Sequence, residues 1–383
     1  MATTALLAAA KNLAPLVAEH RADLARGPDL PTPIADALHA AGLTRLWLPR
    51  AYGGAELPPD DYIRVVEAVA QLDGAVGWCA SIAASGARLA GLLPPEAAGQ
   101  MFGPGRRGLS GSVNPTGSAV EASHGYRVSG RWNWGSFIRH SDWTGGMCIL
   151  RDEQGAPRRD ESGAPLLLAA IVPTETVTIL GNWDGGGLRA SGSHDFDFSG
   201  DVPAERTILL PGFQPMAQIP GLLYGLPFVT TFTLGITPVA LGIARAAIDA
   251  LVALAGRKTP AGTTAPLREQ ASVQGNVARA EALVRSARAF LFDAVGDYWA
   301  AAQRGDAGDV AVRLACWNAA QASKRAVLLM YEAAGGSAAD DRQPFAACLR
   351  DIAAAGQHIA FAERNLEAAG RVFLGMELGT GRF

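Results

Sequence analysis

One stretch near the middle of the chain, residues 125–143, constrains the fold most. It reads GYRVSGRWNWGSFIRHSDW. Tyr126 and Val128 alternate with smaller or polar residues, which is the period-two pattern of a half-buried strand. The Ser-Gly pair at 129–130 predicts a turn, and the segment Trp-Asn-Trp at 132–134 predicts a second, aromatic strand after it. The sequence therefore predicts a β-hairpin at the centre of the chain.

The predicted hairpin opens into Gly135-Ser136, which lies between the indoles of Trp134 and Trp143 in the sequence. Glycine carries no Cβ, so the backbone can approach a flat ligand closely at this point. Aromatic rings stack, and the serine hydroxyl and the backbone N–H groups are hydrogen-bond donors. The pattern suits the site of a planar aromatic cofactor, and it equally suits a tryptophan-rich hairpin in an ordinary sheet core.

The sequence on either side of this stretch divides the chain into three parts. Residues 1–102 show helical spacing of apolar residues, residues 103–210 are richer in glycine and β-branched residues, and helical patterns return from about residue 216. We therefore predict an α+β protein with an N-terminal helical domain at 1–105, a middle β-barrel domain at 106–215 and a C-terminal four-helix bundle at 216–383. The predicted bundle helices are Leu222–Ile248, Arg268–Trp299, Arg313–Ala334 and Phe345–Leu374.

Composition excludes several classes of protein. The 383-residue chain has a net charge of -3 and 49% hydrophobic residues, which excludes extensive disorder and offers no basic surface for nucleic acid. Its four cysteines are scattered without paired spacing, which is typical of a reducing cytosol and matches no zinc signature. The N-terminus predicts a helix rather than a signal peptide, and Pro227 interrupts the apolar run at 221–235. We expect a cytoplasmic protein that binds neither membranes nor nucleic acid.

Three runs of the sequence resemble one enzyme family. GYRVSGRW, followed by Gly-Ser and His-x-Asp-Trp, resembles the middle β-domain of the acyl-CoA dehydrogenase superfamily, in its flavin-dependent monooxygenase branch. NWDGGGLRASGSHD at 182–195 resembles the segment with which this family closes its flavin pocket. LRDIAAAGQH at 349–358 ends in a histidine, as in the monooxygenases, where the dehydrogenases carry a catalytic glutamate. The resemblance covers nearly the whole chain and implies the same three-part fold.

The resemblance implies a two-component monooxygenase. Such an enzyme receives reduced FMN from a separate flavin reductase and uses O2 to form a C4a-hydroperoxyflavin, which hydroxylates an aromatic or amine small molecule. FAD is the alternative cofactor. Residues 333–337 keep the glycines of the dehydrogenases' FAD-binding turn but not its glutamine, and the loop after Lys258 lacks their Phe-Gly pair, which favours FMN. The alanine-rich faces of the bundle predict a homotetramer.

His358 is the candidate catalytic base, because an imidazole with an ordinary pKa of about 6.5 can take a proton from a phenol or an amine at neutral pH. The resemblance also implies a catalytic contribution from Ser136 and a set of flavin-binding side chains: Trp78, Ser112, Thr116, Trp134, Ser136, Arg189 and Ser191. Trp78 has the alternative interpretation of an ordinary core residue, and Arg189 that of an ion pair between subunits. No metal site is predicted.

Two departures from the family pattern keep other functions open. Many relatives carry a histidine about two turns beyond the tryptophan at position 78, whereas residues 81–86 contain none. The family order Ser-Gly is reversed at Gly135-Ser136. The alternatives are an FAD-dependent dehydrogenase or oxidase that uses a different base, and a non-catalytic subunit that keeps the flavoprotein fold.

Overall fold

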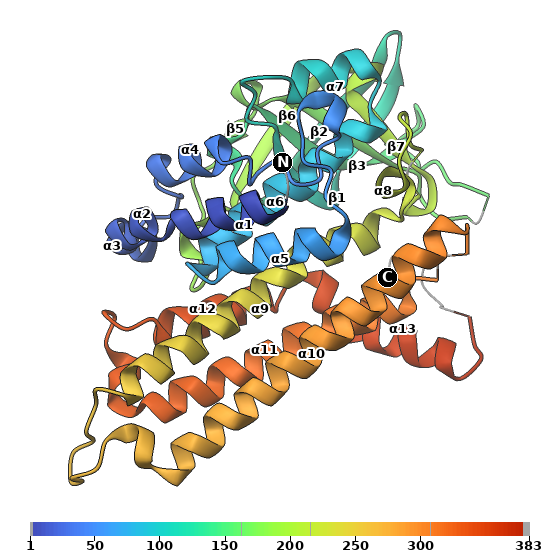
Figure 1. Cartoon of the computed structure of the whole chain (residues 1–383). Helices are drawn as coiled ribbons and strands as arrows, with labels where there is room; N and C mark the ends of the chain where they lie inside the picture. Colours follow the sequence, from blue (N-terminus) through green and yellow to red (C-terminus); the bar gives the residue numbers. More distant parts are fainter. Residues whose placement is uncertain (1–2, 162, 215, 307, 378–383) are drawn as a thin grey trace.

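The computed structural model describes residues 3–161, 163–214, 216–306 and 308–377 (Figure 1). Helices come first: α1 Thr3–Asn12, α2 Ala14–Glu19, α3 Arg21–Arg26, α4 Thr32–Ala40, α5 Pro59–Ala70, α6 Gly74–Ala87 and α7 Pro95–Phe102. Strands follow: β1 Leu109–Ala122, β2 Gly125–Gly135, β3 Trp143–Arg151, β4 Leu167–Pro173, β5 Thr178–Ile179, β6 His194–Pro203 and β7 Thr207–Leu210. The remaining helices are α8 Leu222–Gly225, α9 Phe228–Ala255, α10 Ala271–Gln303, α11 Val310–Ala334, α12 Phe345–Ala355 and α13 Glu363–Phe373. This order of helices, strands and helices is the predicted α+β arrangement.

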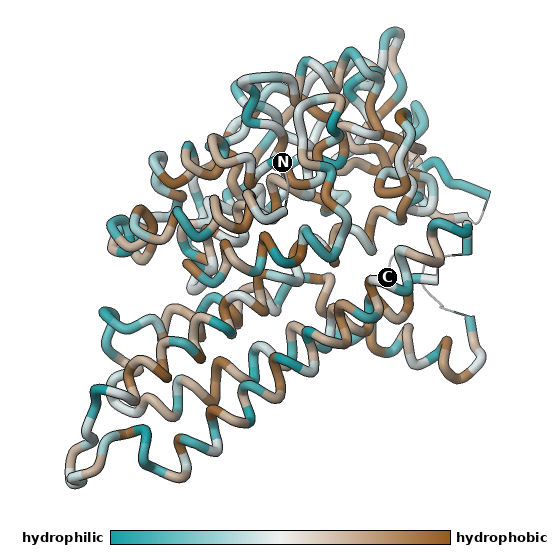
Figure 2. The backbone as a smooth tube through the Cα atoms, in the orientation of Figure 1, coloured by the Kyte–Doolittle hydropathy of each residue, from teal (hydrophilic) through white to brown (hydrophobic). Residues whose placement is uncertain are grey.

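The long helix α9 is the centre of the helical packing. It begins directly after Pro227 and contacts α5 and α6 on one side and α10, α11 and α12 on the other. Figure 1 shows it running between the N-terminal helices and the rest of the bundle, and Figure 2 shows teal residues more frequent along the outer helix α10. Of the described helices, α9 alone is long and apolar enough to cross a membrane, but 67% of its apolar window is buried inside the molecule. Such burial is typical of a core helix.

The strands form one mixed sheet in the order β5-β6-β2-β1-β3-β4-β7. The pairing of β1 with β3 is parallel, and the other pairings are antiparallel. β5 and β7 are the two edge strands and do not pair with each other. In the described part of the chain the strands therefore form an open sheet, where the sequence predicted a barrel. The central strands β1, β2 and β3 carry the segments that the sequence analysis singled out.

The turn predicted at Ser129-Gly130 is wrong, because β2 runs through it without a break. Ser129 pairs with Ser118 of β1 and with Ser199 of β6. A Cβ added at Gly130 would lie 2.7 Å from the Cα of Gly117. Glycine therefore stands here because two strands pack closely, not because the chain turns. The hairpin turn lies instead at residues 123–124, between β1 and β2.

The last predicted bundle helix, Phe345–Leu374, is also wrong as a single element. α12 ends at Ala355, a short 3-10 turn η10 spans Ile359–Phe361, and α13 begins at Glu363. The buried Asn365 stabilises the chain at this break, because its Nδ2 donates to the carbonyl oxygens of Ile359 at 3.3 Å and Ala360 at 2.8 Å. The carbonyl of Ile359 also accepts the N–H of Ala362 at 3.1 Å, which is the bond of the 3-10 turn. The break places His358 at the start of a turn.

Candidate active site

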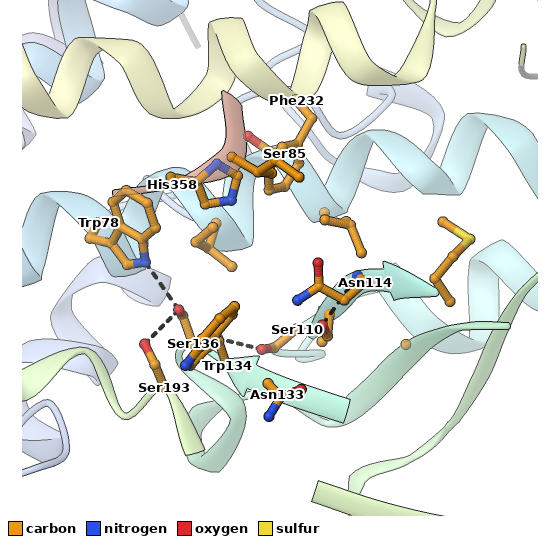
Figure 3. Close-up of a pocket in the computed structure, with 18 of the residues that line it drawn as sticks. Trp78, Ser85, Ser110, Asn114, Asn133, Trp134, Ser136, Ser193, Phe232 and His358 are labelled. Atoms are coloured by element: carbon orange, nitrogen blue, oxygen red, sulfur yellow. Dashed lines mark hydrogen bonds between the residues drawn. The ribbon is translucent and has the colours of Figure 1, made fainter. Parts of the chain in front are cut away.

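A cavity of ≈ 680 Å³ lies where the N-terminal helices, the sheet and the bundle meet. α6 forms one wall and the strands β1 to β3 form another, while α9 and residues 354–364 lie opposite the sheet (Figure 3). Most of its lining side chains are apolar or small. Among the described lining residues, His358 and the solvent-exposed Arg364 are the ionisable ones. A cavity of this size and character is typical of a site for a small molecule or a cofactor.

α6 positions the side chains along one wall of this cavity. Its N-cap is Asp73, whose carboxylate accepts the backbone N–H groups of Ala75 at 2.9 Å and Val76 at 3.1 Å. Helical spacing then places Trp78 and Ser85 on one face, and both line the cavity. The two residues are two turns apart, about 10 Å along the helix axis. Trp78 is thus both a buried residue and part of the cavity wall.

A chain of serine hydroxyls joins the sheet to α6. Ser136 Oγ accepts the indole N–H of Trp78 at 3.0 Å and lies 2.7 Å from Ser193 Oγ, which lies 2.7 Å from Ser191 Oγ. The hydroxyl of Ser110 donates to the backbone carbonyl of Ser136. An indole N–H can only donate, so Ser136 keeps its own proton for Ser193 or for a ligand. The hydroxyl of Ser136 is therefore held in place and still able to donate.

The backbone beside these serines is strained. Of the non-glycine residues with positive φ in the described chain, Trp134 (65°) and Leu188 (49°) line the cavity, and Phe137 (63°) follows Ser136. Such conformations cost about 1 kcal/mol or more and concentrate at functional sites. The register of β2 shifts between Trp132 and Gly135. As a result Trp132 is 1% exposed in the sheet core, whereas the indole of Trp134 is 61% exposed and offers a face on which a planar ring can stack.

His358 lines the cavity from the opposite side. Its ring centre lies 5.9 Å from that of Trp78 and 5.4 Å from that of Phe232 (Figure 3). Its Nδ1 accepts the backbone N–H of Ala360 at 3.1 Å, so the neutral ring carries its proton on Nε2. Burial lowers the pKa of His358 to about 4, because apolar surroundings disfavour the imidazolium.

These observations bear on the role of His358 as the catalytic base, which stays a prediction. Because burial lowers its pKa to about 4, the ring is neutral at physiological pH and is a weaker base than an ordinary histidine. With Nδ1 occupied by Ala360, the nitrogen left for a ligand is the protonated Nε2. The ring in this state donates a hydrogen bond into the cavity and does not accept one there.

Asp351, which follows Arg350 in the third family-like run, holds the loop that carries Leu188. Asp351 Oδ1 accepts the backbone N–H of Leu188 at 2.7 Å, and a Cβ at Gly74 would lie 2.7 Å from Asp351 Oδ2. Burial, together with the nearby Asp73, raises the pKa of Asp351. Burial raises the pKa of Asp73 as well, but the two N–H groups that Asp73 accepts oppose that rise. Of Asp73 and Asp351, it is therefore Asp351 that takes up a proton first. This carboxyl group links α6, the 182–193 loop and α12.

The structure brings six of the predicted site residues to the cavity: Trp78, Ser112, Trp134, Ser136, Ser191 and His358. Thr116 and Arg189 lie outside the lining. Thr116 donates its hydroxyl to the carbonyl of Arg131 at 2.7 Å. Arg189 pairs with Asp184 of the same chain at 2.8 Å and donates to the carbonyl of Arg26 at 3.1 Å. Trp143 does not line the cavity either, and the guanidinium of Arg206 lies 5.0 Å from its ring centre.

Sequence reasoning missed several lining residues. Ser110 lies two positions from Ser112 in strand β1, and period-two alternation could have found it. Ser193 follows a 3-10 turn that ends at Ser191, so alternation gives no signal for it. Phe228 and Phe232 carry a helical i, i+4 spacing at the start of α9. Ser85 gave no sequence signal of its own, because its role depends on what packs behind α6.

Comparison with known proteins identifies the family. Residues 1–91 match the family model for the acyl-CoA dehydrogenase N-terminal domain, and residues 234–363 match that for the C-terminal domain. The chain is 31% identical over 352 residues to an indole-3-acetate monooxygenase from Pseudomonas putida, covering 90% of this chain and 87% of that protein. The chain belongs to the acyl-CoA dehydrogenase superfamily, in its flavin-dependent monooxygenase branch.

Two further proteins are similar to this chain, HsaA in sequence and fold and XiaF in fold. The oxygenase subunit HsaA of a flavin-dependent monooxygenase from Mycobacterium tuberculosis is 26% identical over 374 residues, covering 93% of this chain and 91% of that protein. A crystal structure of HsaA superposes with a TM-score of 0.90 at 24% identity over 100% of both chains. XiaF from Streptomyces sp., solved in complex with FADH2 and glycerol, superposes with a TM-score of 0.89 at 22% identity over 99% of this chain and 97% of that one. The predicted family, the fold and the class of flavin-dependent oxidoreductase are confirmed.

Proposed function

We propose that this chain is the oxygenase component of a two-component flavin-dependent monooxygenase. It takes reduced FMN, with FAD as the alternative, from a separate flavin reductase and uses O2 to hydroxylate an aromatic or amine small molecule. The observation that carries the proposal is the neutral His358 facing the serine chain and Trp134 across the cavity. No aspartate or glutamate is among the described lining residues. A dehydrogenase of this superfamily needs such a carboxylate, and this cavity does not supply it.

The residues present fit the isoalloxazine ring of a flavin. Trp134 offers a stacking face, and Ser136 offers a fixed hydroxyl donor. A Cβ at Gly111 would lie 1.9 Å from the carbonyl oxygen of Gly145, so glycine is what lets β1 and β3 pack this closely beside the cavity. The register shift of β1 between Ser112 and Gly117 leaves the intervening residues outside the ladder with β3. When bound there, reduced flavin would supply the two electrons that activate O2 for transfer of one oxygen atom to the substrate.

The chain's own residues protect and direct this chemistry. Apolar walls, with Ile82 and Leu89 on one side and Phe228 and Phe232 on the other, exclude bulk water and so delay loss of the activated oxygen as hydrogen peroxide. His358 donates its Nε2–H to the oxygen being transferred or to the substrate. Asp351 holds the 182–193 loop, which carries Ser191 and Ser193.

Several finer features belong to the same proposal. The domain limits 1–105, 106–215 and 216–383 are part of it, and they are supported by the ends of α7 at Phe102 and of β7 at Leu210. The exposed apolar side chains of Val372, Phe373, Leu374 and Met376 at the end of α13 support a homotetramer, to be checked by light scattering. The four free, buried cysteines support a cytoplasmic location. Thr116 and Arg189 have no contact with the flavin ring in this proposal.

Stopped-flow absorbance tests the proposal. The purified chain is mixed with reduced FMN, reduced FAD or neither, and then with buffer that contains O2. We expect an oxygenated flavin species that outlives the one formed without protein, and a Trp134→Ala variant that binds reduced FMN about tenfold more weakly, since stacking contributes about 0.5–1.5 kcal/mol beyond buried area. Val252→Ala, which truncates an exposed apolar side chain elsewhere on α9, is the control. A protein that is yellow with FAD as purified favours the dehydrogenase or oxidase, and absence of flavin binding favours the non-catalytic subunit.

A further inference from the structure

Ser85 is the buried polar side chain through which α6 faces the cavity on the side of His358 and Phe232. It is 8% exposed, whereas the buried serines 110, 136, 191 and 193 belong to the strand side. Figure 3 shows this division, with Ser85 and His358 drawn near Phe232 and the serine chain on the opposite side. The flavin proposed above occupies the strand side, so Ser85 faces the space left for a substrate.

The hydroxyl proton of Ser85 is directed away from the cavity. Ser85 Oγ lies 3.1 Å from the hydroxyl oxygen of Tyr62, which also lies 3.2 Å from the carbonyl oxygen of Ser81 and 3.1 Å from that of Gly235. Burial raises the pKa of Tyr62, so this hydroxyl keeps its one proton. The one tyrosine proton can go to a carbonyl oxygen or to Ser85 Oγ. If it goes to a carbonyl, Ser85 donates to the tyrosine oxygen and the group makes two hydrogen bonds; if it goes to Ser85, the group makes one and leaves the serine proton unpaired. The arrangement with two hydrogen bonds is favoured, and in it the tyrosine oxygen accepts from Ser85.

An oxygen oriented in this way offers lone pairs to the cavity and no proton. Ser85 is then an acceptor, and His358, with its proton on Nε2, is a donor. The lining has no carboxylate, and its one cationic side chain, Arg364, is exposed to solvent. A buried acceptor left without a partner costs free energy, so a ligand that brings a donor is favoured over the same ligand without one.

We propose that Ser85 selects a neutral aromatic substrate that carries a hydrogen-bond donor, O–H or N–H, on its ring, and that Tyr62 is the positioning residue that keeps Ser85 an acceptor. This inference rests on the proposed monooxygenase function and adds the substrate class to it. An O–H donor also has an oxygen that can accept from His358. Methylation of the donor removes the hydrogen bond to Ser85 and adds bulk at that point.

Binding measurements on matched probe pairs test the inference without turnover. The probes are 2-naphthol with 2-methoxynaphthalene, and indole with 1-methylindole, each titrated by calorimetry into the purified full chain with and without FMN. In the wild type we expect the donor-bearing member of each pair to bind about tenfold more tightly or better. In Ser85→Ala the ratio should fall to about one. Ser81→Ala is the matched control, because Ser81 lies one turn earlier on α6, bonds the carbonyl of Trp78 and does not line the cavity.

Tyr62→Phe tests the positioning role. Phenylalanine keeps the ring stacked on Trp47, whose ring centre lies 3.8 Å away, but removes the acceptor of the Ser85 proton. The freed hydroxyl of Ser85 can then donate, so the methoxy probe should gain affinity relative to 2-naphthol, which loss of packing alone would not produce. The thermal denaturation midpoint of each variant is recorded beside the binding ratio.

Several outcomes overturn the inference: a wild-type ratio near one, a ratio that Ser85→Ala leaves unchanged, or no binding of any probe at millimolar concentration. The reduced-FMN experiment keeps the two proposals apart. If reduced FMN binds and the probe ratio is one, the substrate class is wrong and the monooxygenase assignment stands. If the ratio is as expected and no flavin binds, Ser85 selects a ligand but the proposed reaction is wrong.

Discussion

Replacing His358 by Asn and by Gln distinguishes the roles of its two ring nitrogens, Nδ1 and Nε2. Asn places its side-chain oxygen near the position of Nδ1, so it can still accept the N–H of Ala360, which is 3.1 Å from Nδ1 in the native protein. It then presents no donor where Nε2–H stood. Gln reaches further and can place an amide N–H near the position of Nε2, while losing the bond to Ala360. A donor role therefore predicts that Gln retains function that Asn loses.

The expected size of the effect follows from one lost donor in a buried site. Such a loss costs about 1–3 kcal/mol, which corresponds to roughly 5- to 140-fold. We expect His358→Asn to reduce product formed per reduced flavin by that factor and to release the difference as hydrogen peroxide, while His358→Gln stays within about fivefold of the wild type. Single turnovers with reduced FMN, O2 and substrate, analysed for both products, give these numbers.

The pH profile distinguishes the donor from a base. Because the pKa of His358 is lowered to about 4, the ring is already neutral at physiological pH, and the wild-type yield should not change with its titration between about pH 6 and pH 8. A rise in single-turnover rate through a pKa of about 6.5 that His358→Asn abolishes would refute the donor and restore the base. Equal losses in both variants, with a flat profile, would reduce His358 to a packing residue.

Further predictions concern the groups around His358. Asp351→Asn keeps an acceptor for Leu188 N–H, 2.7 Å away in the native protein, and removes a buried charge. Since the pKa of Asp351 is raised on folding, the folded state binds more protons than the unfolded state above the ordinary aspartate pKa, and the wild type loses stability as pH rises through that window. Since burial raises the pKa of Asp351 to about 7, thermal denaturation should show the variant gaining stability relative to the wild type between about pH 4 and about pH 7, and a pH-independent difference would contradict the raised pKa. Ser136→Ala breaks the chain between Trp78 and Ser193 and should shorten the lifetime of the oxygenated flavin by roughly 5- to 140-fold. Unchanged lifetime and FMN affinity would remove Ser136 from the site.

Sequence patterns predicted the structure correctly where neighbouring residues along the chain determine it. The strand at Tyr126 and Val128 lies where its sequence indicated, within β2. The turn at 129–130 failed because the reason for Gly130 lies on another strand: its missing Cβ makes room for Gly117. Arg189 was predicted to bind the flavin because it lies in the family-like run at 182–195. Its side chain instead binds Asp184 and the carbonyl of Arg26. Such pairings depend on tertiary neighbours, which no local pattern encodes.

His358 shows how a residue can be located from sequence while its chemistry depends on the fold. The family-like run at 349–358 predicted a histidine at the site, and the sequence predicted a continuous helix around it. The buried Asn365 instead binds the carbonyls of Ile359 and Ala360, and the chain breaks at His358. The break lets the N–H of Ala360 reach Nδ1, which leaves the proton on Nε2. The position of His358 at the start of this turn, rather than inside a helix, thus leaves its imidazole a hydrogen-bond donor toward the cavity.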